Sequence, residues 1–185
     1  MIAMKLHHSP RGCVAHLMAT CATTGSKPLR AAPQVDLRRY MGEWRVIACV
    51  GNSVERDFVD ATESYALRDD GNIGVTFRWR EKHFSTPAKT HEFIGWPVDS
   101  HNARWKMRLV AFFTASYVIL AVHPKYEWAA VGHPSRKFGW VFARERTMDD
   151  ATYEEIMRVF QEQGYDIRQF IKVPQLTFET VQRGA

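Results

Sequence analysis

The chain has 185 residues, a formal net charge of +5 at pH 7 and an aromatic content of 12%, with six tryptophans and eleven phenylalanines. This length suffices for one domain with a full hydrophobic core, and the mild charge without long Lys/Arg runs argues against nucleic acid as a partner. So many rings fill either a large core or a lined cavity. The three cysteines, Cys13, Cys21 and Cys49, lack the spacing of a zinc site, so we predict neither a metal nor a cofactor.

Residues 1–35 differ in composition from the rest of the chain. Lys5 and Arg11 precede a short apolar run that ends in L-M-A-T before Cys21, and a small, polar stretch follows. This order resembles a bacterial lipoprotein signal, with Cys21 as the lipidated residue and a flexible tether after it. The alternative is a disordered tail. The chain has no run of about 18 uninterrupted apolar residues, so we predict no membrane-spanning helix.

Residues 36–175 form the expected domain, in which short apolar or alternating segments are separated by turn signals. The clearest alternation places Val75, Phe77 and Trp79 on one face of a segment and Arg78 on the other. The expected strands cover residues 44–50, 61–67, 73–80, 89–98, 103–109, 117–122, 126–131 and 138–143. Eight strands joined by short turns predict an all-β fold, an eight-stranded antiparallel up-and-down β-barrel without exposed edges.

One helix is expected after these strands. Asp149 or Asp150 can cap it, Gly164 ends it, and an apolar stripe that includes Ile156 and Phe160 must pack on the outside of the barrel. A short closing strand is expected near residues 170–173. Residues 176–185 have no strong signal and are interpreted as a C-terminal tail.

The start of the first strand and the end of the eighth suggest how the barrel is closed at one end. Gly42 and Trp44 open the first strand, and Arg144 ends the eighth. If Trp44 lies inside the closed end, the Arg144 guanidinium can lie over the indole face and donate hydrogen bonds to nearby carbonyls. We predict that these three residues have a structural role.

These motifs resemble those of the lipocalin family. The similarity extends to Y-A-L-R-D-D-G-N (residues 65–72), Lys125-Tyr126, F-G-W-V-F-A-R (residues 138–144) and G-Y-D-I-R-Q-F-I (residues 164–171). The similarity covers residues 35–174. Within the family, the chain most resembles the bacterial outer-membrane lipoproteins related to apolipoprotein D. The resemblance implies binding and transport or storage of small hydrophobic ligands inside the barrel. It also implies a place at the outer membrane or in the periplasm, with a soluble protein as the alternative and a monomer or homodimer as the assembly.

Strand alternation predicts which side chains line the barrel and contact a ligand. The predicted ligand-binding residues are Val46, Ala48, Tyr65, Val75, Phe77, Trp79, Trp105, Met107, Leu109, Tyr117, Ile119, Trp140 and Phe142. This largely apolar lining suits a fatty acid or a lysophospholipid. The alternative is that the rings fill the barrel completely.

Two further features bear on the polar part of a ligand. Glu63 falls on the same inner face, where a carboxylate must be paired or protonated, unless a shift of one residue turns it outward. Arg78, Arg80, Lys82 and Lys89 form a candidate cationic rim for a carboxylate or phosphate, or simply the solvated face of a strand.

The sequence does not predict an enzyme. Alternation turns Cys49 to the face opposite Ala48, and hence outward, and the histidines are scattered rather than grouped with a nucleophile. The alternative is a lipocalin-fold enzyme or isomerase that acts on a lipid through a residue inside the barrel.

Overall fold

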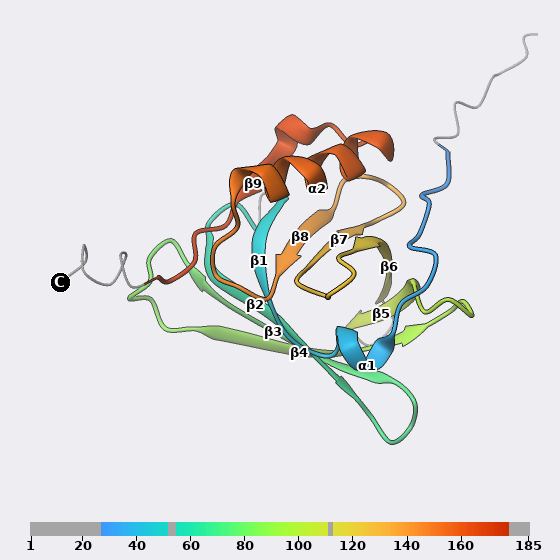
Figure 1. Ribbon diagram of the computed structural model, residues 1–185. Coiled ribbons are helices and arrows are strands. Elements are labelled where there is room, and N and C mark those ends of the chain that lie inside the picture. Colours follow the sequence, from blue (N-terminus) through green and yellow to red (C-terminus); the bar gives the residue numbers. More distant parts are fainter. Residues whose placement is uncertain (1–26, 52–54, 111–112, 178–185) are drawn as a thin grey trace, which may run out of the picture.

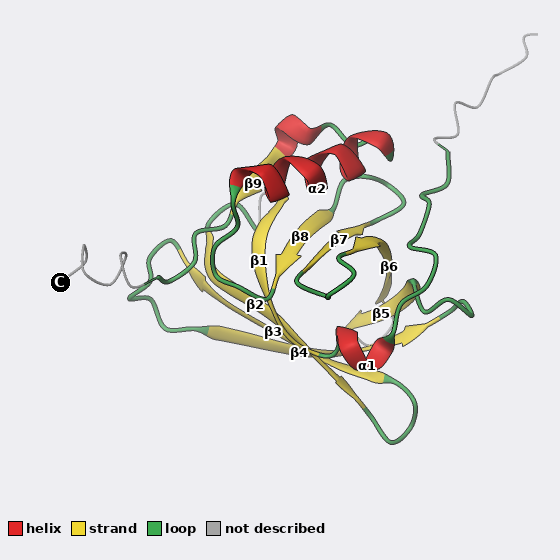
Figure 2. Cartoon of the chain, in the orientation of Figure 1, coloured by secondary structure: helices red, strands yellow, loops and turns green. Residues whose placement is uncertain are grey.

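The computed structural model describes residues 27–51, 55–110 and 113–177, without the side chains of residues 109 and 110. Eight antiparallel strands pair in chain order, and the last pairs with the first, as Figures 1 and 2 show. The strands are β1 (Gly42–Val50), β2 (Phe58–Leu67), β3 (Ile73–Glu81), β4 (Lys89–Pro97), β5 (Arg104–Val110), β6 (Phe113–Val122), β7 (Trp128–Gly132) and β8 (Gly139–Ala143). The predicted up-and-down barrel is confirmed.

The predicted helix, α2 (Asp150–Glu162), lies along the outside of the barrel (Figure 1). Asp149 caps it by accepting a hydrogen bond from the backbone N–H of Thr152. Its buried face packs on an outer-wall cluster from β1, β6, β7 and β8, which includes Ile47, Ala48, Val50, Val118, Leu120, Ala130 and Val141. The 3₁₀ turn Ile167–Gln169 and β9 (Phe170–Lys172) follow, and β9 extends the sheet beside β1.

The end of the barrel at the start of β1 is closed by one arginine. The guanidinium carbon of Arg144 lies 3.7 Å from the centroid of the Trp44 ring, which is fully buried. Arg144 also donates hydrogen bonds to four backbone carbonyls: those of Arg39 and Tyr40 in α1 (Leu37–Tyr40), of Met41 after it, and of Glu43 in β1. Gly42 has a φ of +94°, and a Cβ there would lie 3.3 Å from an Arg144 nitrogen. The tight turn and the arginine therefore fit each other.

A β-bulge in β1 reverses the predicted alternation after Val46. The register between β1 and β8 shifts between Val46 and Ala48. As a result Val46 and Cys49 both belong to the interior cluster, whereas Ala48 belongs to the cluster under α2. The predictions that Ala48 faces inward and Cys49 outward are wrong, because an extra residue in one strand exchanges the two faces beyond it.

The C-terminal segment after β9 fills a gap in the barrel wall. β1 and β2 pair only over Gly42–Arg45 and Thr62–Tyr65. Beyond that point the Val173 N–H donates to the Ile47 carbonyl at 2.9 Å, and the Asp60 N–H donates to the Pro174 carbonyl at 2.7 Å. The segment thus connects the two strands where they no longer pair.

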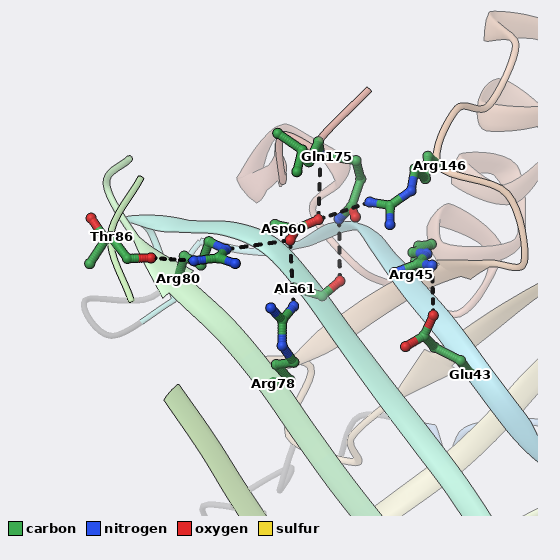
Figure 3. Close-up of polar contacts among 10 residues, drawn as sticks. Glu43, Arg45, Asp60, Ala61, Arg78, Arg80, Thr86, Arg146 and Gln175 are labelled. Atoms are coloured by element: carbon green, nitrogen blue, oxygen red, sulfur yellow. Dashed lines mark hydrogen bonds and ion pairs between the residues drawn. The ribbon is translucent and has the colours of Figure 1, made fainter. Parts of the chain in front are cut away.

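Asp60 holds this junction together through its side chain (Figure 3). It lies at a bulge of β2 with a φ of +50° and is buried. Its carboxylate is 3.0 Å from Arg146, 3.5 Å from Arg78 and 3.6 Å from Arg80. The two arginines of the predicted cationic rim therefore surround a carboxylate on the outer wall, and Lys89 pairs with Glu81 at 2.7 Å.

We predict that Arg144→Ala lowers the free energy of unfolding by about 2–4 kcal/mol, because it removes the cation–π contact and the donors to four carbonyls. Arg144→Lys should lose about half as much, since an ammonium keeps the charge but not the planar fork. Urea unfolding followed by tryptophan fluorescence measures both. Arg38→Ala, at an exposed position, is the control. A wild-type midpoint for Arg144→Ala would contradict the structural role of the plug.

Candidate ligand-binding site

A cavity of about 450 Å³ occupies the half of the barrel away from the Trp44 plug. Its volume lies within the range of sites that hold a small molecule. Its wall is mostly apolar, and its mouth includes Glu55 before β2, the start of β6 at Phe113 and the turn between β7 and β8. The lining residues are Glu55, Glu63, Phe77, His91, Phe93, Met107, Phe113, Thr114, Ala115, Ser116, Tyr117, His133, Phe138 and Trp140.

Four of the predicted ligand-binding residues lie on this wall: Phe77, Met107, Tyr117 and Trp140. Six others are buried in the interior cluster but are not among the described lining residues: Val46, Tyr65, Val75, Trp105, Ile119 and Phe142. Trp79 is half-buried against the same cluster, and Ala48 is on the outer side. The side chain of Leu109 lies outside the described part of the structure. Contact of any of these residues with a ligand stays a prediction.

The closed half of the barrel is solid because aromatic rings fill it. Tyr40 packs on Trp44, Tyr65 and Trp105 with centroid distances of 5.1–5.4 Å, and Trp105 stacks on Tyr117 at 5.2 Å. The expectation that rings fill the barrel therefore holds for this half, and the open half keeps the cavity.

Sequence reasoning missed the lining residues of β4 and of the cavity mouth. His91 and Phe93 come from β4, whose polar flanking residues hid its inner face, and they lie opposite Phe77 and Val75 of β3. Pairing β4 with the clearly alternating β3 would have identified them, because residues opposite Val75 and Phe77 share their inward face. Phe113 and Phe138 are at the mouth and are 72% and 40% exposed.

Glu63 lies on the cavity wall, so the predicted inward orientation is correct and the alternative, a shift of one residue that turns it outward, is not found. It is only 9% exposed and lies opposite Trp44 on β1 and Phe77 on β3. Burial raises the pKa of this carboxyl to about 8; a hydrogen bond with Tyr65 opposes the rise, and the charge of Glu55 adds to it. Glu63 is therefore mostly protonated at neutral pH.

A chain of hydroxyl groups continues from Glu63 into the closed half of the barrel. The Tyr65 and Tyr117 hydroxyl oxygens are 2.7 Å apart, and so are those of Tyr117 and Tyr40. Burial raises the pKa of all three tyrosines, so they stay protonated. Glu63 and Tyr117 are the members of this chain that reach the cavity.

The mouth of the cavity carries few charged groups. Trp140 donates its indole N–H to the Glu55 carboxylate at 3.2 Å, and burial lowers the pKa of His133 so that it is neutral at pH 7. No lysine or arginine belongs to the described lining. The predicted cationic rim is therefore not part of this cavity.

We looked in the described part of the chain for two features of a catalytic centre, a metal-binding group of side chains and a reactive thiol. No three His, Cys, Asp or Glu side chains are grouped there as for a metal ion. Burial raises the pKa of the Cys49 thiol to about 12, and Cys49 lies in the interior cluster rather than on the cavity wall. A thiol in this state is a poor nucleophile.

Glu63 should make stability depend on pH. Between its ordinary pKa of 4.5 and its folded pKa of about 8, only the unfolded state releases the proton, so the free energy of unfolding falls as pH rises through this window. We predict that Glu63→Gln gains stability relative to wild type, on the order of 3 kcal/mol, between about pH 5 and pH 8. Urea unfolding at both pH values measures this difference, with the exposed Glu92→Gln as control. A difference that does not change with pH would show that Glu63 is ionised in the folded protein.

The barrel and its sequence are similar to those of known proteins. Residues 35–175 match the family model of the lipocalin-like domain. The chain is 29% identical over 166 residues to the outer membrane lipoprotein Blc of Citrobacter freundii, covering 87% of this chain and 92% of the relative. It is 27% identical over 162 residues to temperature-induced lipocalin-1 of Arabidopsis thaliana, covering 82% and 86%.

Solved structures agree with this match. The cockroach allergen Per a 4 superposes with a TM-score of 0.64 at 21% identity, over 83% of this chain and 95% of that one. Insecticyanin from the tobacco hornworm Manduca sexta superposes with a TM-score of 0.63 at 16% identity, over 82% and 86%. The fold and the family match coincide, and the chain belongs to the lipocalin-like family.

Proposed function

We propose that this protein binds a fatty acid or a lysophospholipid in its cavity and transports or stores it. The lipocalin family is known for binding small hydrophobic ligands, and the cavity of about 450 Å³ with its mostly apolar wall is the observation that carries the proposal. The exposed rings of Phe113 and Phe138 extend this apolar surface to the mouth. They give an acyl chain a continuous apolar path into the barrel.

The free energy of binding would come from burial of the acyl chain. Each methylene contributes about 0.8 kcal/mol, so roughly ten buried methylenes supply about 8 kcal/mol before the cost of ordering the chain. The charged head group would stay at the mouth, because the described cavity wall offers it no lysine or arginine.

The alternative is a lipocalin-fold enzyme that acts on a lipid through a residue inside the barrel. Its thiol candidate, Cys49, is buried away from the cavity wall with a raised pKa. The burial and the raised pKa of Cys49 favour a binding protein over a thiol-dependent isomerase.

Filling the cavity should abolish binding without unfolding the barrel. Ala115 on β6 lies opposite Met107 on β5, and both line the cavity. We predict that Ala115→Phe weakens binding of hexadecanoic acid at least about tenfold, because the ring takes the space of the acyl chain. Displacement of a fluorescent apolar probe measures the affinity, and circular dichroism checks the fold.

Thr90→Phe, on an exposed position of β4, is the matched control and should bind as wild type does. Equal affinity of Ala115→Phe and wild type would contradict binding in this cavity.

The second part of the proposal is a place at the outer membrane or in the periplasm, through a lipid on Cys21. Cys21 lies outside the described residues, and the support comes from its signal-like surroundings and from relatives named as outer membrane lipoproteins. No described helix is long and apolar enough to cross a membrane. A protein without the anchor is the alternative, as a monomer or a homodimer.

Metabolic labelling tests the anchor. In a bacterial host grown with labelled palmitate, we predict that the full chain becomes labelled and that Cys21→Ala does not. Cys13→Ala is the matched control, because it removes a nearby cysteine without changing the L-M-A-T run before Cys21, and it should stay labelled. Absence of label on the unmodified chain would favour the soluble alternative.

A further inference from the structure

The deep end of the cavity carries a carboxyl group that the binding of a plain acyl chain does not use. Glu63 is nine-tenths buried, and the cavity wall to which it belongs is mostly apolar, with Phe77 and Met107 among its side chains. A terminal methyl group placed against it would leave its remaining hydrogen-bonding capacity without a partner, which is costly in an apolar site.

Glu63 and the three tyrosines have one more O–H donor than they have hydrogen bonds among themselves. Three tyrosine hydroxyls and the protonated Glu63 supply four O–H donors. Three hydrogen bonds join these groups, namely Tyr40 with Tyr117, Tyr117 with Tyr65, and Tyr65 with Glu63. One of the four O–H donors therefore has no acceptor among these four groups.

The direction of the chain decides which donor this is. If Tyr65 accepted from Glu63, one of the three tyrosines would keep the unpaired donor: Tyr40 or Tyr65 in the interior cluster, or Tyr117 on the cavity wall. If Tyr65 donates to Glu63, Tyr117 must donate to Tyr65 and Tyr40 to Tyr117, and the unpaired donor is the acid O–H on the cavity wall. The second arrangement is favoured, because the hydrogen bond with Tyr65 lowers the pKa of Glu63, as it does when the carboxyl group accepts, and because an unpaired donor costs least where a ligand can reach it.

We propose that the cavity selects single-chain lipids that carry an uncharged oxygen acceptor, a hydroxyl or a carbonyl, on the part of the chain that reaches Glu63. This inference rests on the proposed function and specifies its ligand class. The Glu63 acid group donates to that oxygen.

Charge explains why the deep oxygen is uncharged and why the carboxylate or head group lies at the mouth. The titratable groups around Glu63 are Tyr65 on its own strand, Tyr117 on β6, Tyr40 on α1 and Glu55 at the mouth, and none of them is a cation. His91, on β4, and His133, directly after β7, belong to the same wall but not to the strands next to β2. A second carboxylate beside Glu63 would therefore meet no compensating charge.

The test compares fatty acids with their ω-hydroxy counterparts, from decanoic to hexadecanoic acid, by displacement of a fluorescent apolar probe from the full chain. The two members of each pair differ in one hydroxyl at the end of the chain. At the length that reaches Glu63, the ω-hydroxy acid should bind about tenfold tighter than the plain acid to the wild-type protein.

Substitutions at the site complete the test. Glu63→Leu should reverse the preference, because the ligand hydroxyl then meets an apolar wall, and Glu63→Gln should retain it, because the amide still donates. Ser64→Leu, the next residue of β2 on the opposite face, is the matched control and should retain it too. If Glu63→Leu does not fold, the wild-type pairs still decide the question.

A wild-type protein that binds the plain acid as tightly as the ω-hydroxy acid at every length would overturn the inference and leave the proposed function standing. A preference for the ω-hydroxy acid that survives in Glu63→Leu would also overturn the inference and leave the proposed function standing. Binding of neither series, with no binding of the apolar probe, would overturn the proposed function together with the inference.

Discussion

The contact between Arg144 and Trp44 is the interaction on which the rest of the structure depends. One guanidinium lies on the indole and donates to four carbonyls, so α1, β1 and the end of β8 are held at one point. With that end closed, the rings of Tyr40, Trp105 and Tyr117 pack above the plug and fill half of the barrel. The cavity is what remains, and its depth is set by where these rings end.

The opposite end of the barrel is held in a different way. β1 and β2 separate there, and the C-terminal segment joins them through backbone hydrogen bonds. Three arginines, from β3 and from the segment after β8, surround Asp60 of β2 at this junction (Figure 3). This group lies on the outer wall, so its charge does not enter the cavity. The separation between a charged outer junction and an apolar interior is what makes the cavity suited to a hydrophobic ligand.

Much of the fold could be predicted from the sequence because half-buried strands and amphipathic helices have periods that can be read directly. β3 and β5 alternate clearly, and the stripe of α2 places it outside the barrel. The bulge in β1 could not be predicted, since it shows only in the register against β8, and it exchanged the faces of Ala48 and Cys49. The arginines around Asp60 were also hidden, because residues 60, 78, 80 and 146 meet only through the folded topology.

The site was predicted in part for a similar reason. Alternation gives the face of a residue but not its height in the barrel, so residues of the solid half, such as Trp105, were grouped with residues of the wall, such as Phe77. Glu63 was recognised as unusual from its position alone. Its protonation and its hydroxyl partners needed the structure, because Tyr40 and Tyr117 come from other elements.

The closed plug, the ring-filled half and the apolar wall together lead to the proposal that the cavity holds a hydrophobic ligand. Native mass spectrometry of the full chain, purified without detergent and followed by organic extraction of the bound molecules, tests it most directly. We expect a complex heavier than the chain by the mass of one single-chain lipid, and the extract should identify that lipid. A protein that carries no lipid, and that takes up none when fatty acids and lysophospholipids are added, would contradict lipid binding in the cavity.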